Sequence, residues 1–421
     1  MVRTRQLKRG EVTYSWAKEE KANMLIALED NDQTNHQLAH LYRHSTLVEQ
    51  LAAHHLGISP KECEVAGGWF HGSVPISVRG RRQMLMRFPI FHRVGESFRP
   101  GNSDEKWLPR CFHHIRCQIL NLFGYTVPSK YVRHQGLSFD VLKAGYLLIE
   151  YIDKSKGTML SYTWVDKHHD NSLCSNLFKG LSRILLDIAK VPVPRIGSFV
   201  IIDDGFLMLN NRPLSIEIHE LEGKQIPVDL PRDMTYSSAD SYITDILAFH
   251  DSRFAHQPNA PKDSADGAFQ AAALATMRTV FSYFFKRELR RGQFVYVLND
   301  LHQSNILVDE DWNITCLIDL EFACSRPIEI LHPPHWFTNH YVIAHHEFVT
   351  LMEQQEKQIY TDITIPVASV MKRGLESKSF WYSLALKSIT GLEHIFFEHI
   401  ETTFANDADD DPTFIKVAHK F

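Results

Sequence analysis

Cysteine is scarce and scattered in this chain of 421 residues. Its six cysteines form no C-x-x-C pair and no dense framework, which excludes a small disulfide-stapled fold and a thiolate zinc motif. The 24 histidines also show no standard zinc spacing, even where two of them are neighbours. Such cysteine usage is typical of a reducing compartment, so we expect a cytoplasmic protein.

Long hydrophobic runs are also missing. No apolar run approaches the roughly 18 residues needed to span a bilayer. The basic N-terminal segment MVRTRQLKRGEVTYSW lacks the apolar core of a secretory signal. A net charge of −5 gives no general attraction to nucleic acid or to an anionic membrane. We therefore expect neither a nucleic-acid partner nor a membrane partner, and the sequence indicates no protein partner.

No internal repeat and no low-complexity tract interrupts the chain. Hydrophobic residues make up 44% and charged residues 23% of it, which is ordinary for a globular protein. The length allows two or three domains with a large hydrophobic core. Composition therefore bounds the size of the protein, and its chemistry has to be inferred from motifs.

The most informative stretch covers residues 293–327, QFVYVLNDLHQSNILVDEDWNITCLIDLEFACSRP. The apolar run Phe294–Leu298 predicts a short buried strand. Two further β-type runs, Ile306–Val308 and Ile314–Ile318, are separated by acidic and amide residues with the turn chemistry of a hairpin. Side chains at the ends of this hairpin should lie close to the end of the first strand.

Three oxygen-bearing side chains occupy those strand ends: Asp300, Asn305 and Asp319. Taken singly, each is better explained as a loop cap or a polar strand end. Phosphoryl transfer, however, needs oxygen ligands for Mg²⁺ and a carboxylate that orients the attacking hydroxyl. The spacing D-x4-N, followed by Asp after a hairpin, matches the kinase arrangement of base and two metal ligands. Together the three residues favour ATP- and Mg²⁺-dependent phosphoryl transfer.

The segment NDLHQSNILVDEDWNITCLIDLEFA resembles the catalytic stretch of the aminoglycoside phosphotransferase-like family, which is similar to choline kinases and protein kinases. It is most similar to that stretch in the fungal members. The resemblance spans roughly residues 50 to 405 and is sharp only at 293–327. It implies that Asp300 is the catalytic base and that Asn305 and Asp319 bind metal, with Glu321 as a further candidate ligand.

In the N-terminal third, the resemblance implies a nucleotide site. Glycine lets backbone N–H groups approach phosphate oxygens, so the turn holding Gly68, Gly72 and Ser73 is expected to cover the phosphates. On its own this signal is weak, because ordinary hairpin turns also use glycine. Arg87 stands at the family's Lys or Arg position and is expected to hold phosphates, the alternative being a surface arginine on a strand.

The segment 145–153, GYLLIEYID, predicts a buried strand that leaves the core at Glu150. In the family, this segment is the hinge between two lobes. Backbone groups near Glu150 and Ile152 are therefore expected to contact adenine. Without the surrounding motifs, the same segment would be interpreted simply as a core strand.

The chain departs from the family pattern in two places. A helix from about 103 to 123 should supply a Glu that pairs with the cation, yet Arg110 stands where that Glu is expected and Pro109 interrupts the helical pattern. Glu105 is the candidate replacement. Family members also usually carry His-Gly-Asp where this chain has Leu298-Asn299-Asp300. These departures keep open a catalytically impaired, kinase-like binding or scaffold protein, and a third alternative is nucleotide-dependent non-phosphoryl transfer such as nucleotidyl transfer.

The rest of the pattern is mainly helical. Helices are predicted over 14–57, 172–190, 236–253 and 269–290, with a hairpin over 199–209 and a polar loop over 256–267. In related folds, inserted helices help to form the acceptor pocket. The candidate contacts to the acceptor substrate are Tyr236, Asp240, Asp245, His250 and His302. For each of these, capping or core packing is the stronger alternative.

We therefore predict an α+β, two-lobe protein kinase-like fold with a small antiparallel β-sheet lobe and a larger, mainly helical lobe. The expected divisions are a helical extension over 1–57, a β-rich nucleotide-binding lobe over 58–153 and a catalytic and substrate lobe over 154–421. The expected ligands are ATP, Mg²⁺ and a small-molecule acceptor whose identity the resemblance does not indicate.

Overall fold

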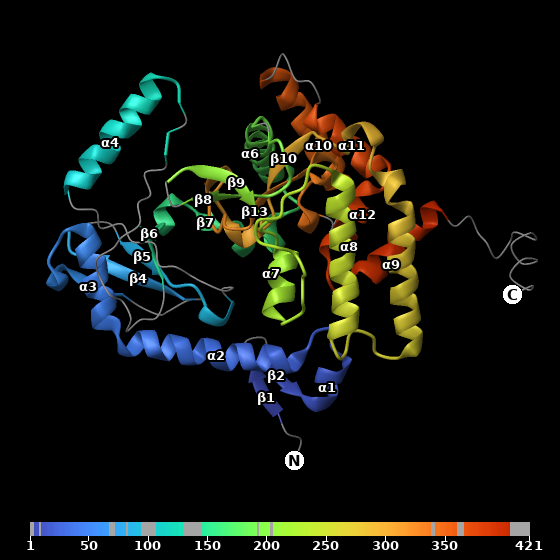
Figure 1. Cartoon of the computed structure of the whole chain (residues 1–421), viewed down its shortest axis with the longest axis horizontal. Coiled ribbons are helices and arrows are strands. Elements are labelled where there is room, and N and C mark those ends of the chain that lie inside the picture. Colours follow the sequence, from blue (N-terminus) through green and yellow to red (C-terminus); the bar gives the residue numbers. More distant parts are fainter. Residues whose placement is uncertain are drawn as a thin grey trace, which may run out of the picture.

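The structure is a computed structural model, and the residues that it describes are 4–7, 10–66, 72–80, 83–93, 107–125, 127–128, 145–191, 193–202, 205–337, 342–359 and 366–404. Two lobes are apparent in Figure 1, a small one that holds a β-sheet and a larger one made mainly of helices. Among the described helices, none combines the length and the apolar character needed to cross a bilayer.

The chain begins with a feature that the sequence did not predict, a hairpin of β1 (Thr4–Leu7) and β2 (Gly10–Thr13). The predicted helices over 14–57 are confirmed as α1 (Tyr14–Glu19), α2 (Met24–Arg43) and α3 (Ser45–Leu56). Gly57 ends α3 with φ of 65°, a left-handed conformation that glycine adopts without steric cost.

The small lobe is built on one antiparallel sheet of four strands in the order β3-β4-β5-β6. Its strands are β3 (Cys63–Val65), β4 (Ser73–Val78), β5 (Met84–Arg87) and β6 (Leu147–Glu150). Alternate residues of β4 are buried against α3, as the period of two requires. The strand predicted over 145–153 is present, but the prediction that it is buried was wrong. β6 is the edge strand of the sheet, and Leu147 is 57% exposed.

Helix α4 (Trp107–Leu122) confirms the helix expected between 103 and 123. Pro109 does not interrupt it, because a proline in the first turn of a helix loses no intrahelical hydrogen bond. From α4, the Arg116 guanidinium lies 5.5 Å from the ring centre of Phe206, which belongs to the larger lobe.

The larger lobe contains three small groups of strands. The hairpin β8 (Ser198–Ile201) and β9 (Leu207–Asn211) confirms the predicted one. The other two groups are β10 (Phe294–Leu298) with β13 (Ala323–Pro327), and β7 (Thr158–Met159) with β11 (Ile306–Val308) and β12 (Ile314–Leu317). All three strands predicted between 293 and 320 are therefore confirmed within one residue.

Helices surround these strands. They are α5 (Trp164–Lys167), α6 (Asn171–Ala189), α7 (Ile216–Gly223), α8 (Ala239–His256), α9 (Ser264–Phe284), α10 (Val342–Ile359), α11 (Val367–Glu376), α12 (Ser379–Lys387) and α13 (Leu392–Ile395). The loop predicted over 256–267 is shorter than expected. The Asp263 side chain accepts a hydrogen bond from Asp266 N, so α9 begins at Ser264 and not near residue 269.

Two cores fill the larger lobe. One lies among α8, α9 and α12, and the other lies among α6, α10, α11 and the strand β10. Trp312, between β11 and β12, is fully buried in the second core and stacks on Trp164 with ring centres 5.5 Å apart. This packing holds the β11–β12 hairpin against α5 and α6.

A bridging segment, residues 20–43, contacts both lobes (Figure 1). In the larger lobe, Asn259 Nδ2 donates to Glu20 O at 2.8 Å and to Ala22 O at 2.9 Å. Helix α2 then runs to the small lobe, where Gln37 Nε2 donates to Pro89 O at 2.8 Å. The helical extension predicted over 1–57 thus has contacts to the larger lobe at one end of α2 and to the small lobe near the other.

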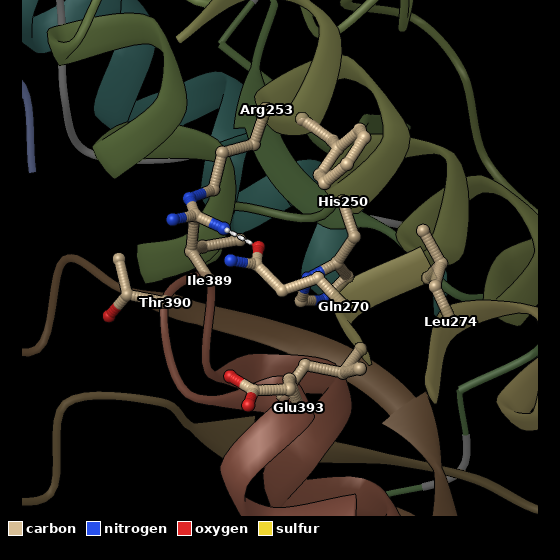
Figure 2. A pocket seen from close by; sticks show the side chains of 9 residues that line it. His250, Arg253, Gln270, Leu274, Ile389, Thr390 and Glu393 are labelled. Atoms are coloured by element: carbon tan, nitrogen blue, oxygen red, sulfur yellow. Dashed lines mark hydrogen bonds between the residues drawn. The ribbon is translucent and has the colours of Figure 1, made fainter. Parts of the chain in front are cut away.

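A second anchor of the bridging segment is Lys21. Its ammonium pairs with Glu393 at 3.3 Å, and its carbonyl accepts hydrogen bonds from Arg253 and Gln257. Figure 2 shows Arg253 donating to Gln270 beside Glu393, around a cavity of about 20 Å³. A space of this size holds about one water molecule. These contacts make a buried polar anchor of the segment before α2.

Replacing Asn259 with Ala should detach this end of the bridging segment. The variant loses two hydrogen bonds to backbone carbonyls, so we expect the free energy of unfolding to fall by about 1–3 kcal/mol. Amide hydrogen exchange should accelerate first in residues 20–27. Gln33→Ala removes an exposed hydrogen bond to Glu29 on the same helix and should change stability by less than about 0.5 kcal/mol. Equal exchange in the two variants would contradict the anchoring role.

Candidate active site

Asp300 is placed by the pairing of β10 with β13. The two strands are antiparallel and stay in register, from the pair Phe294 and Pro327 to the pair Leu298 and Ala323. Directly after β10, Asn299 N donates to Phe322 O at 2.8 Å, which continues the pairing by one step. The chain then turns away from the sheet, so Asp300 lies at the open end of a buried strand pair.

Asn305 lies directly beside Asp300, as expected. Its Nδ2 donates to the backbone oxygen of Asp300 at 2.8 Å and to Oδ2 of the Asp300 carboxylate at 3.1 Å. Between them, the His302 side chain caps the turn by accepting from Ser304 N. This turn places Asn305, which is buried, at the start of β11.

Burial raises the pKa of the Asp300 carboxyl above its ordinary value. The Asn305 hydrogen bond and nearby His302 oppose this rise, whereas the negative charges of Asp319 and Glu321 add to it. Asp300 is therefore electrostatically coupled to both acidic residues that follow β12. A carboxylate with a raised pKa is a stronger base, which suits a proton acceptor.

Asp319 and Glu321 lie at the lobe interface and share one cation. The Arg87 guanidinium donates through Nη1 to the Asp319 carboxylate and through Nη2 to Glu321 Oε1, the latter at 2.7 Å. Asp319 has φ of 53°, a left-handed backbone conformation that is uncommon outside glycine and recurs at functional sites. The last residue of β5 thus binds the segment that directly follows β12.

The chemistry of these donors fits a divalent cation with a preference for oxygen. The Asn305 amide uses its nitrogen on Asp300, which leaves Oδ1 as an acceptor, and Asp319 and Glu321 contribute half-exposed carboxylates. Mg²⁺ is bound by a few protein oxygens and completes its shell with water and phosphate oxygens. Within the described part of the chain, no cluster of three His, Cys, Asp or Glu side chains could hold a metal alone. The amide and the nucleotide would have to complete the shell.

A cavity of about 440 Å³ opens beside Asp300. Its lining includes Asp300 and His302 from the catalytic loop, Glu217 from α7, His332, and Lys387 from α12. Ligand pockets for small organic molecules commonly have volumes of about 300–1,000 Å³. The arrangement can therefore present a hydroxyl of a small molecule to the Asp300 carboxylate.

Residues 114–329, just over half of the chain, match the family model described as the phosphotransferase enzyme family. The chain belongs to this phosphotransferase family. A search of curated proteins found no match.

Among solved structures, the chain is similar to an aminoglycoside phosphotransferase in complex with ADP and hygromycin B, with 12% identity and a TM-score of 0.40. That alignment covers 83% of this chain and 93% of the other. A choline kinase from Streptococcus pneumoniae matches at 13% identity over 83% of this chain and 90% of the other, with a TM-score of 0.35. A Plasmodium vivax ethanolamine kinase matches at 14% identity over 84% of this chain and 83% of the other, with a TM-score of 0.37.

The expected α+β, two-lobe kinase-like fold is confirmed. The four-stranded antiparallel sheet precedes the larger helical lobe, and the sequence motif on which the family resemblance rests lies at their junction. Two hydrogen bonds support the loop that follows β10, residues 299–305. Trp336 Nε1 donates to Leu301 O at 2.9 Å, and Asn299 Nδ2 donates to Cys324 Sγ at 3.1 Å.

Sequence reasoning missed Trp336 as a support of the catalytic loop. The signal was the irregular segment HPPHWF at 332–337, where two prolines prevent a helix from forming before the tryptophan. The side chain is buried in the same core as Trp164, so its indole N–H needs a hydrogen-bond acceptor and finds one in the loop.

Four of the five candidate acceptor contacts do not line the cavity, within the described part of the chain. Tyr236 is buried and donates its hydroxyl to Asp245 at 2.8 Å, and Asp240 pairs with Arg290 at 3.4 Å. His250 is buried against the carbonyl of Leu386, and burial lowers its pKa to about 4. None of these four residues lines the cavity beside Asp300, so their contact with an acceptor stays a prediction without support from this cavity. His302 alone of the five lines the cavity.

The remaining candidates belong to the small lobe and the hinge. Gly72 has φ of 79° and a Cβ there would lie 2.3 Å from Phe88 O, so glycine is required by the close approach of two strands. Ser73 is paired in register with Arg87. Glu150 is exposed and pairs with Lys156 at 3.1 Å, and Ile152 is half-buried just beyond β6. Gly68, Glu105 and the Arg110 side chain lie outside the described residues.

Replacing Trp336 with Phe should test the support of the catalytic loop. The change keeps a buried ring but leaves the Leu301 carbonyl without its donor, so we expect the free energy of unfolding to fall by about 1–3 kcal/mol in urea titrations. Trp16→Phe is the control, because that indole is 45% exposed and its replacement should have an effect within about 0.5 kcal/mol. If both variants are equally stable, the Trp336–Leu301 hydrogen bond does not support the loop.

Proposed function

We propose that the protein transfers the γ-phosphoryl group of ATP to a hydroxyl of a small molecule in the presence of Mg²⁺. One observation carries this proposal: Asp300 lines the 440 Å³ cavity, and its carboxylate at the same time accepts a hydrogen bond from Asn305, a candidate metal ligand. A base that faces an acceptor pocket on one side and a candidate metal site on the other is the arrangement that phosphoryl transfer requires. Membership of a phosphotransferase family supports the same conclusion.

In this proposal, Asp300 orients the acceptor hydroxyl and accepts its proton. The acceptor oxygen forms a bond to the γ-phosphorus, the bond from that phosphorus to the bridging oxygen breaks, and ADP leaves. Asn305 fixes the Asp300 carboxylate through its Oδ2. Asn305, Asp319 and Glu321 would hold Mg²⁺, which when bound neutralises charge on the phosphate oxygens.

The small lobe would supply the nucleotide contacts. Arg87 now pairs with Asp319 and Glu321, and we expect it to exchange these partners for phosphate oxygens when the nucleotide binds. The turn from Gly68 to Ser73 would cover the phosphates, because Ser73 lies opposite Arg87 in the sheet. Backbone groups of Glu150 and Ile152 would contact adenine. The chain would then need no ion pair from Glu105 to hold Arg87 in place.

Two structural observations favour an active enzyme over a catalytically impaired scaffold. The loop that lacks the family's histidine is supported by Trp336 instead, and Arg87 is held by carboxylates from the catalytic hairpin instead of a glutamate in α4. A nucleotidyl transferase on the same fold would attach AMP to the acceptor and release pyrophosphate. Analysis of products by mass therefore separates the two kinds of transfer.

Metal-nucleotide binding should depend on Asp319 and turnover on Asp300. In thermal unfolding, wild type should be stabilised only by ATP and Mg²⁺ together, by about 2.7 kcal/mol at a hundredfold excess over the dissociation constant. Asp319→Asn should lose this stabilisation because it removes a carboxylate ligand. Asp300→Asn should keep the stabilisation and lose turnover by about 10²–10⁴-fold, the usual contribution of a general base.

Two outcomes would contradict these assignments. Full turnover in Asp300→Asn would exclude Asp300 as the base. An undiminished thermal stabilisation in Asp319→Asn would exclude Asp319 as a metal ligand. No shift in wild type at millimolar ATP and Mg²⁺ would favour the scaffold. Asp311→Asn, in the exposed turn between β11 and β12, is the control for the loss of one carboxylate.

Replacing Arg87 with Met should weaken nucleotide binding without unfolding the protein. Its ion pairs are partly exposed, and such pairs contribute only about 0–1 kcal/mol to stability. Charge-assisted bonds to phosphate contribute more, so we expect about a 10- to 100-fold loss of ATP affinity by calorimetric titration. Arg93→Met removes a similar pair with Asp30 and should bind ATP normally. A parallel loss in both variants would exclude a specific phosphate contact by Arg87.

A further inference from the structure

Within the described ranges, some charged side chains that line the cavity beside Asp300 are paired with an opposite charge, and others are not. Glu217 of α7 accepts three hydrogen bonds from Arg326 of β13 at 3.0–3.3 Å, and both side chains are buried. Burial alone would raise the pKa of Glu217, but the Arg326 charge outweighs it and holds that pKa below its ordinary value. Glu217 is thus ionised and already neutralised, so it offers little attraction to a cationic ligand.

The second acid of the lining is Glu220. Its carboxylate lies 3.5 Å from the Lys224 ammonium, and its side chain is 47% exposed. An acid in contact with water is screened and binds a cation weakly. Apart from Asp300, which the proposed function assigns to the acceptor hydroxyl, the acids of the lining are therefore either neutralised or exposed to solvent.

Lys387 differs from Glu217 because its charge is not paired within the described part of the chain. It is the last residue of α12, it lines the cavity and it makes no hydrogen bond or ion pair with any described residue. Burial, together with the nearby Arg326 charge, lowers the pKa of its ammonium to about 8. The C-terminal end of a helix favours a cation only slightly. The negative charge of Glu217 opposes the lowering of the Lys387 pKa, but Glu217 is already paired with Arg326, so among the described residues no carboxylate forms an ion pair with Lys387 itself.

His332 adds unpartnered hydrogen-bonding groups to the same wall. Both of its ring nitrogens are buried and have no hydrogen-bond partner, and its ring packs edge-on against Phe380 with centres 5.4 Å apart. Burial holds its pKa well below the ordinary value, so the ring is neutral at pH 7 and has one N–H donor. Buried polar groups without partners in a native protein commonly mark a place where a ligand or water binds.

We propose that the cavity binds an acidic acceptor, a small hydroxylated compound whose carboxylate or phosphate group lies against Lys387 and accepts a hydrogen bond from His332. This inference rests on the proposed function, since it places the hydroxyl of the same molecule at Asp300. An anionic group would pair with the Lys387 ammonium and accept from His332, so it would give both unpartnered side chains a partner at once. A cationic acceptor would add a second positive charge beside Lys387.

Four compounds of similar size separate the classes of acceptor: gluconate, glucose 6-phosphate, glucose and glucosamine. Their affinities are measured by calorimetric titration into protein saturated with Mg²⁺ and a non-hydrolysable ATP analogue, at constant ionic strength. We expect gluconate, glucose 6-phosphate or both to bind at least tenfold more tightly than glucose and glucosamine. Binding of one anion alone identifies the carboxylate or the phosphate as the recognised group.

Variants of the cavity wall test the residues themselves. Lys387→Met should weaken binding of the anionic compound by about 10- to 100-fold, whereas Lys387→Arg should retain most of it. His332→Phe keeps the packing on Phe380 and should weaken binding by about 2- to 10-fold. Lys357→Met, an exposed lysine on α10, removes the same charge elsewhere and should bind normally.

The inference and the proposed function fail in different ways. Stabilisation by ATP with Mg²⁺ in wild type and in Lys387→Met, with no preference for the anions, would overturn the acidic acceptor and leave the kinase proposal standing. Preferential binding of glucosamine would assign the cavity to a cation held by Glu220. Loss of nucleotide stabilisation in wild type, with anion binding intact, would overturn the kinase proposal alone. Binding of none of the four compounds would also overturn the acidic acceptor.

Discussion

The buried ion pair between Arg326 and Glu217 is the interaction on which the catalytic half of the molecule depends. Arg326 belongs to β13, which pairs with β10 and thereby places Asp300, and Glu217 belongs to α7, which forms one wall of the cavity. Both charges are removed from water, so each requires the other. Removing one partner of such a pair typically costs about 3–5 kcal/mol. The pair thus ties the position of the base to the shape of the pocket.

The catalytic strands could be predicted from the sequence because their signals are local. Phe294–Leu298 is a continuous apolar run, and the residues between β11 and β12 carry side chains that form turns by themselves, as when Asp309 Oδ1 accepts from Asp311 N and Asn313 N. Asp300, Asn305 and Asp319 follow from these elements by spacing alone. The same holds for α3, since Gly57 ends it through its own conformational freedom.

Features that depend on contacts between distant segments could not be predicted. Tyr236 lies just before α8, where its backbone pairs with Ile196 and its hydroxyl donates to Asp245, and its own sequence does not indicate the pairing with Ile196. β6 appeared buried because its residues are apolar, yet it is the last strand of its sheet. The pairing of Arg87 with Asp319 joins residues that are far apart in the chain, and the family resemblance gave each a role at the nucleotide site without indicating that they pair.

The bridging segment has a mechanical consequence. A two-lobe protein with a single hinge can open by swinging in several directions, whereas a second attachment, away from the first, defines an axis. Helix α2 provides that second attachment, with Asn259 at one end and Pro89 near the other. Relative motion of the lobes is then restricted to a twist about the line through both attachments. Such a twist changes the distance between Arg87 and Asp319 without separating the lobes.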